Sequence, residues 1–131
     1  MGAMSPRRRV GAGVLALLLL SAGLTHFLNP SFFISIVPPF IPWPRLAVGL
    51  SGAAELVLGV SLLIPRISRL AAAGAALLFV AVFPANIYHW LGHVQAGGMV
   101  APGWYHTVRL PLQPLLVAWA WWLSRAPAEN P

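Results

Sequence analysis

Polar side chains recur at helical spacing inside the long apolar stretches of this sequence. Asn86, His89 and His93 follow one another at i, i+3 and i+7, and Arg109 and Gln113 at i and i+4. Each set would therefore lie on one face of a helix. Polar groups are costly in hydrocarbon and by default mark a functional site. The pattern predicts a site to which several helices contribute.

Two earlier stretches add an ionisable residue each. His26 lies near the end of the first, and Glu55 follows Arg45 by ten residues, about 15 Å along a helix. A carboxyl group at that depth must be neutral, or paired with Arg109 or a histidine. We expect a polar pocket that opens toward one end of the helices and has Glu55 at its floor. The residues expected to bind a ligand there are His26, Glu55, Asn86, His89, Arg109 and Gln113.

Other chemistry remains open for the same residues. His89 and His93 could share a metal or a haem iron with His106, since imidazole suits zinc, copper, iron or nickel. A second alternative is a polar network that only fastens the helices together. Glu55 and a histidine could move protons, but the sequence contains no nucleophile constellation, phosphate loop or cofactor fingerprint. We therefore assign no metal ligand and no cofactor, and expect no independent catalytic activity.

Composition places the chain among membrane proteins. Its 131 residues are 59% hydrophobic and 8% charged, with a mean hydropathy of +0.80, whereas soluble domains carry about a quarter charged residues. The isoelectric point near 11.8 reflects eight arginines, no lysine and two glutamates. These arginines separate hydrophobic runs rather than forming one solvated face, so nucleic-acid binding is not expected. The absence of cysteine excludes disulfides.

Four apolar stretches are long enough to cross a bilayer as helices. The start, "RRR" followed by "VGAGVLALLLLSAG", fits a signal peptide, but apolar character continues to Phe33, which favours a retained span. We predict an all-α protein with one domain over residues 1–131, an integral membrane four-helix bundle of up-down topology. The spans are expected at about 10–30, 46–64, 69–91 and 109–124, and the outer loops at 31–45 and 92–108.

Arginine asymmetry predicts the orientation. Six arginines precede the first span, fill the short "PRISR" turn between the second and third, or follow the fourth, whereas Arg45 and Arg109 lie at the other end. By the positive-inside rule both termini are then cytoplasmic. Tryptophans near both boundaries fit aromatic belts.

The first outer loop contains the stretch "NPSFFISIVPPFIPWP". Its five prolines force extended or turn conformations. Its apolar residues would be shielded from water only by packing on protein or by lying at the membrane interface. We therefore predict an ordered cap over the outer end of the bundle. Within the spans, Gly52 and Gly59 share the face of Glu55 and would leave room beside it. Pro84 would bend its helix and free the carbonyl of Val80.

Four motifs carry a family resemblance: "HFLNPSFFISIVPPFIPWP", "SGAAELVLGVSLL", "FPAN" and "RLPLQ". Together they resemble the DoxX-like family of small bacterial membrane proteins, from about His26 to Trp122. The resemblance implies a four-span bundle in the bacterial cytoplasmic membrane and a link to redox complexes, including subunits associated with quinol or thiosulfate oxidation. The positions that match the pattern include His26, Glu55, Asn86, Arg109 and Gln113. His89 departs from it, because the family usually has an apolar residue there.

Two hypotheses about function follow besides the metal site. In the first, the pocket binds a small, partly apolar molecule such as a quinone or another lipid-soluble metabolite, with polar residues holding its head and helix faces the rest. In the second, the chain is a structural or assembly subunit that docks a larger oxidoreductase. Its small size and short loops fit that role.

Overall fold

The computed structural model describes residues 5–35, 37–91, 95–96, 99–100 and 103–125, with side chains described for 5–35, 37–88 and 108–125. Within these residues the fold is all-helical apart from one short ladder, in which β1 (Gln95–Ala96) pairs antiparallel with β2 (Met99–Val100). The helices are α1 (Pro6–Leu28), α2 (Pro30–Ser35), α3 (Pro44–Leu62), α4 (Ser68–Leu91) and α5 (Gly103–Ser124).

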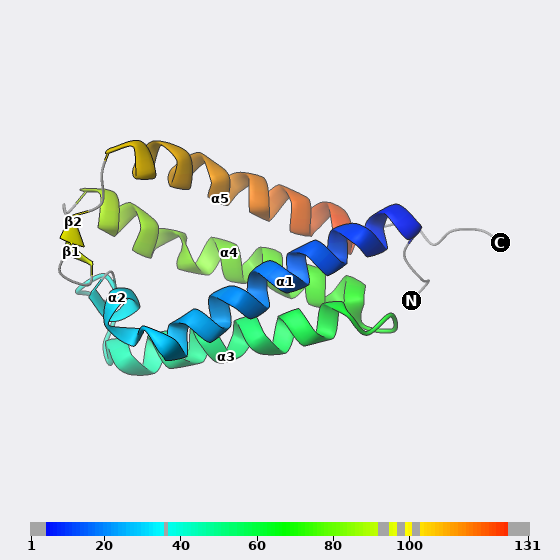
Figure 1. Ribbon diagram of the computed structural model, residues 1–131, viewed down its shortest axis with the longest axis horizontal. Helices are drawn as coiled ribbons and strands as arrows, with labels where there is room; N and C mark the ends of the chain where they lie inside the picture. The colour runs from blue at the N-terminus through cyan, green and yellow to red at the C-terminus, as the bar shows by residue number, and fades with distance from the viewer. Residues whose placement is uncertain (1–4, 36, 92–94, 97–98, 101–102, 126–131) are drawn as a thin grey trace.

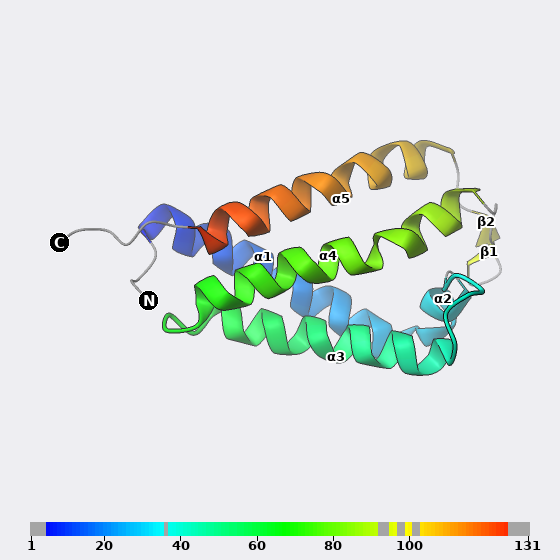
Figure 2. The same ribbon diagram turned by 180° about the vertical axis from the view of Figure 1, so that it is seen from behind.

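The four long helices lie side by side along the long axis of the molecule and alternate in direction (Figures 1 and 2). α1 packs along α3 and α4 packs along α5, while α3 also contacts α4. The short helix α2 and the β ladder lie at one end, opposite the two chain termini (Figure 1). The described part of the chain thus has two distinct ends, and the four long helices run between them.

Prolines and a serine set where the helices begin. The Ser5 hydroxyl accepts a hydrogen bond from the Arg8 backbone N–H at 3.3 Å and caps α1, whose first residue is Pro6. Proline suits this position because its fixed φ matches the helix and its missing N–H is not needed there. α3 begins in the same way at Pro44. The residue before it, Trp43, has φ 50°, a conformation uncommon for residues other than glycine.

Three of the described helical segments are long and apolar enough to cross a membrane: Pro6–Leu28, Pro44–Leu62 and Ser68–Tyr88. They cover the first three predicted spans. These helices are also apolar on their outer surfaces, so burial within the chain does not account for their hydrophobicity. The fold is therefore consistent with a multi-pass membrane protein.

Two predicted loops are partly helical, and the boundaries in the prediction were wrong there. α2 lies within the predicted loop 31–45, because Pro30 can start a helix and the next proline is Pro38. α5 begins at Gly103, six residues before the expected start of the fourth span at 109. No proline separates Gly103 from Pro111, and the helix continues through Pro111 and Pro114.

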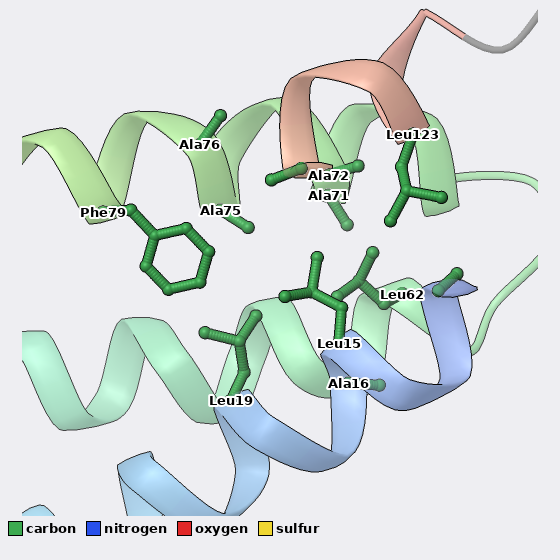
Figure 3. Close-up of a cluster of buried hydrophobic side chains, with 12 residues drawn as sticks. Leu15, Ala16, Leu19, Leu62, Ala71, Ala72, Ala75, Ala76, Phe79 and Leu123 are labelled. Atoms are coloured by element: carbon green, nitrogen blue, oxygen red, sulfur yellow. The ribbon is translucent and has the colours of Figure 1, made fainter. Parts of the chain in front are cut away.

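The hydrophobic core fills the half of the molecule near the termini (Figure 3). Leu15 and Leu19 of α1 point toward the small side chains of α4, where Ala72 and Ala75 are completely buried. Leu123 of α5 closes the cluster from the other side. Alanines allow the helix backbones to approach closely, which favours van der Waals packing.

Glycines bring α1 and α3 together at the other half. A Cβ on Gly52 would lie 2.7 Å from the Cβ of His26, and a Cβ on Gly23 would lie 2.9 Å from the Gly52 carbonyl oxygen. Neither position can accept a side chain without moving a helix. Gly52 and Gly59 therefore do not leave room beside Glu55 as predicted: α1 occupies that space, with Leu20 against Gly59.

Candidate functional site

A cavity of about 150 Å³ lies at the end of the molecule that carries α2. Its walls come from α1, α2 and the segment after it, the first half of α3, the second half of α4 and the start of α5. Most lining side chains are apolar, among them Phe33, Val37 and Pro38 under the cap. The polar or charged lining residues are His26, Ser51, Glu55, Asn86 and Arg109.

His26 and Glu55 form a buried pair across the contact of α1 with α3. His26 Nδ1 lies 3.2 Å from Glu55 Oε2 and 2.7 Å from the carbonyl oxygen of Ala22. Since a carbonyl oxygen only accepts, Nδ1 carries the proton and donates it to Ala22 along the shorter contact. Glu55 is thus paired with a histidine, one of the two partners that the sequence indicated, and it makes no ion pair with Arg109 in the described part of the chain.

The carboxylate nevertheless keeps an unsatisfied atom. Glu55 Oε2 is buried and has no hydrogen-bond partner among the described residues, because the single Nδ1 proton of His26 points to Ala22. The contact at 3.2 Å is therefore an electrostatic contact and not a full hydrogen bond. A buried acceptor without a partner costs about 1–3 kcal/mol.

A second buried atom in the cavity is also unsatisfied. Asn86 Nδ2 is a donor with no partner in the described residues. It lies on α4 two residues after Pro84, which also lines the cavity. An unpaired acceptor and an unpaired donor thus come from two different helices and border the same cavity. Native proteins leave few such groups without an explanation, and a partner from outside the chain, such as a water or a ligand, is one.

Residues of α2 and of the segment 37–43 form one wall of the cavity. The Phe33 ring from α2 stacks on the His26 imidazole, with ring centroids 3.8 Å apart and planes at 16°. Val37, Pro38 and Ile41 complete the same wall. The sequence predicted an ordered cap at this position, and apolar residues of the segment do cover the cavity at this end of the helices.

Arg109 and Gln113 form a chain of hydrogen bonds that ends on α4. Arg109 Nη1 donates to Gln113 Oε1 at 2.8 Å, and Gln113 Nε2 donates to the Phe79 carbonyl oxygen at 2.7 Å. The carbonyl that α5 engages is that of Phe79 and not that of Val80, the one Pro84 was expected to free. Phe79 is buried in the hydrophobic core, whereas Val80 is exposed.

Four of the six predicted ligand-binding residues line the cavity: His26, Glu55, Asn86 and Arg109. Gln113 does not line it; its side chain is fully buried and holds the Arg109 guanidinium in place. The side chain of His89 lies outside the described residues, as do those of His93 and His106. Among the described residues, no group of three His, Cys, Asp or Glu could hold a metal ion.

Sequence reasoning did not assign Ser51 or Phe33 to the ligand-binding residues, although both line the cavity. Ser51 precedes Glu55 by four residues and so faces the same way on α3. That spacing was available in the sequence. Phe33 could be found only as part of the cap, because its stacking on His26 depends on α2 being helical.

The size of the cavity limits what it can hold. An apolar cavity of about 150 Å³ accommodates one benzene ring. Exposed Ala81 and Pro84 lie on its border, so the cavity reaches the surface of α4. A ring-sized polar head could therefore occupy the cavity while an attached chain leaves along the helix surface.

These features define an all-helical protein, consistent with a multi-pass membrane protein, that has a partly polar cavity at one end. The chain belongs to the family described as Domain of unknown function (DUF8561), which matches residues 15–124. The matched segment includes every polar residue that lines the cavity. Comparison with curated proteins gave no match, and comparison with solved structures gave none either.

Proposed function

We propose that this chain is an integral membrane protein, a four-helix up-down bundle whose cavity binds the polar head of a small, partly apolar molecule. A quinone or another lipid-soluble metabolite has this combination of a ring-sized head and an apolar remainder. The proposed contacts come from Glu55, Asn86 and Arg109, with His26 and Gln113 holding two of them in position. His89 is included as a sequence-based candidate at the same end of α4.

The apolar surface supports membrane insertion. Leu17, Leu50 and Leu77 expose 67%, 61% and 71% of their surface on three different helices. α5 contributes Leu115, which is 65% exposed, and this supports α5 as the fourth span. Exposed apolar area on every side of a bundle would be unfavourable in water and is expected against lipid. Exposed tryptophans near both ends, Trp43 and Trp121–Trp122, fit the two interfaces.

One observation carries the proposal: Glu55 Oε2 and Asn86 Nδ2 are buried, have no hydrogen-bond partner in the described residues and border the same cavity. A ligand with a hydroxyl donor and an oxygen acceptor would satisfy both. Arg109 adds guanidinium donors on the same side, which suit a carbonyl or an anionic oxygen. A purely structural network would have paired these atoms with each other or with the backbone.

The resemblance to the DoxX-like proteins supports a bacterial cytoplasmic membrane and a redox or respiratory context. The arginine distribution supports cytoplasmic termini, which would turn the cavity toward the outer face. A larger oxidoreductase is then a possible partner for this small chain. We propose binding as its role and assign it no catalytic activity of its own.

The hydrogen bonds of Gln113 favour a second candidate function, a structural or assembly subunit. They join α5 to the α4 backbone inside the bundle and need no ligand. That role predicts that filling the cavity leaves function intact, whereas ligand binding predicts its loss.

Mass spectrometry of the protein purified from membranes tests the proposal. We expect a small molecule to co-purify with the wild type and to be lost from Ala85→Leu, because Ala85 lines the cavity. Ala53→Leu is the matched control, since Ala53 is exposed on α3 and does not line the cavity. The proposal fails if no small molecule accompanies the wild type and none binds when quinones are added.

A further inference from the structure

A second hollow lies at the opposite end of the molecule, near the termini. Its volume is about 150 Å³, and it lies between the first turns of α1 and the turn that joins α3 to α4. One charged side chain, that of Arg9, borders it. The remaining walls are mostly apolar or small: Ala12, Gly13, Leu62, Leu63, Pro65 and Ser68.

Arg9 is one of six arginines at this end of the molecule, and Arg66 directly follows the lining residue Pro65. Of the six arginines at this end, two have partners on α5: Arg8 donates to the Trp122 carbonyl at 2.7 Å, and Arg69 to the Ser124 carbonyl at 3.3 Å. The Arg9 side chain is exposed and makes no hydrogen bond or ion pair in the described part of the chain, and neither does the side chain of Arg66. Within the described residues the acidic side chain is Glu55, which lies in the other half of the molecule. No described carboxylate therefore neutralises these guanidinium groups.

Apolar surface continues outward from the hollow. Leu63 borders it and is 57% exposed, and Val10 in the first turns of α1 is 69% exposed. Arg9 thus lies at the edge of an apolar groove. An amphiphile with an anionic head would match this arrangement. A free phosphate ion would satisfy the arginines but leave the apolar wall uncovered.

We propose that this hollow binds one anionic phospholipid, with its phosphate against Arg9 and Arg66 and an acyl chain along Gly13 and Leu63. The inference rests on the membrane insertion proposed above but not on the ligand of the other cavity. A zwitterionic lipid would bind less well, because its own cationic group faces the same arginines. Each arginine near a membrane surface changes the affinity for anionic lipid by about fivefold.

Gly13 permits a steric test of the same site. A Cβ at this position would meet nothing within 4 Å, so a larger side chain can enter the hollow without displacing the backbone. Gly49 of α3 offers the matched control, because its Cβ would also meet nothing within 4 Å and it borders no hollow described above. Gly13→Leu and Gly49→Leu add the same side chain at partly buried helix positions.

Native mass spectrometry of the full chain in detergent measures the proposed binding. Phosphatidylglycerol and phosphatidylcholine with identical acyl chains are added, and inorganic phosphate is added in a separate arm. We expect about fivefold higher retention of phosphatidylglycerol and no competition by phosphate at equal concentration. Arg9→Gln should lower that retention about fivefold, and Gly13→Leu should lower it as well. Arg45→Gln and Gly49→Leu should leave it unchanged.

Equal retention of the two lipids, or unchanged retention by Arg9→Gln and Gly13→Leu, would overturn the proposal. Competition by inorganic phosphate would identify an anion site that does not need a lipid, and would also overturn it. Far-ultraviolet circular dichroism of each variant shows whether the helices are intact. Loss of the lipid with retention of the small molecule in the other cavity separates this inference from the proposed function.

Discussion

Asn86→Leu is expected to stabilise the ligand-free protein while removing its ability to bind the ligand. Asn86 Nδ2 is buried without a hydrogen-bond partner in the described residues. Leucine has the same branched outline as asparagine, is somewhat larger and has no donor to desolvate. The substitution should therefore remove a penalty without opening a void.

The magnitude follows from the cost of an unpaired buried donor, about 1–3 kcal/mol. Leucine is bulkier than asparagine, and crowding of its methyl groups against the cavity wall offsets part of this stabilisation. We expect the free energy of unfolding to rise by about 1 kcal/mol. If Asn86 were held in a structural network of hydrogen bonds, the same substitution would lower the free energy of unfolding by a similar amount.

Unfolding of the purified protein in mixed micelles, titrated with sodium dodecyl sulfate and followed by circular dichroism, measures this difference. Ile87→Leu is a suitable control, because Ile87 is partly buried on the next position of α4 and does not line the cavity. If Asn86→Leu lowers the free energy of unfolding by 1 kcal/mol or more relative to this control, Nδ2 has a structural partner and our reasoning about the cavity is wrong.

Three further predictions use the same unfolding assay. Gln113→Leu should destabilise the protein by about 2 kcal/mol, because it removes two hydrogen bonds worth about 1 kcal/mol each; a neutral result would show that these bonds contribute nothing. Gly52→Ala should cost about 1–3 kcal/mol through overpacking against His26, whereas Gly49→Ala should be neutral or stabilising. Equal effects of the two alanines would contradict the close approach of α1 and α3. Phe33→Ala should cost about 1 kcal/mol from the lost stacking and should weaken co-purification of the ligand; unchanged co-purification would show that the cap does not retain it.

Hydrophobic patterning predicted the long helices because each needs one uninterrupted apolar run, and those runs are visible in the sequence. It missed α2, since a six-residue helix leaves no periodic signal and the surrounding prolines favoured extended structure. The start of α5 was also missed. The residues before Arg109 are less apolar than the predicted span, and hydropathy alone ends where the apolar run ends.

The sequence predicted which helix faces carry the residues of the candidate site, but not which side chains contact one another. The spacing of Glu55 and Asn86 indicated that each points inward, and both line the cavity. The pairing of Glu55 with His26 depends on how closely α1 approaches at Gly52. Gln113 shares the helix face of Arg109 but lies too deep in the contact with α4 to reach the cavity. Such differences of a few ångströms depend on tertiary packing, which one sequence does not encode locally.

Titration of the purified protein with a short-tailed quinone, followed by intrinsic tryptophan fluorescence, measures whether the cavity binds such a ligand. We expect saturable binding by the wild type and by Ile87→Leu, and at least about tenfold weaker binding by Asn86→Leu, which corresponds to the loss of one hydrogen bond of about 1.4 kcal/mol. Absence of saturable binding by the wild type, or equal affinity for all three proteins, would contradict this expectation.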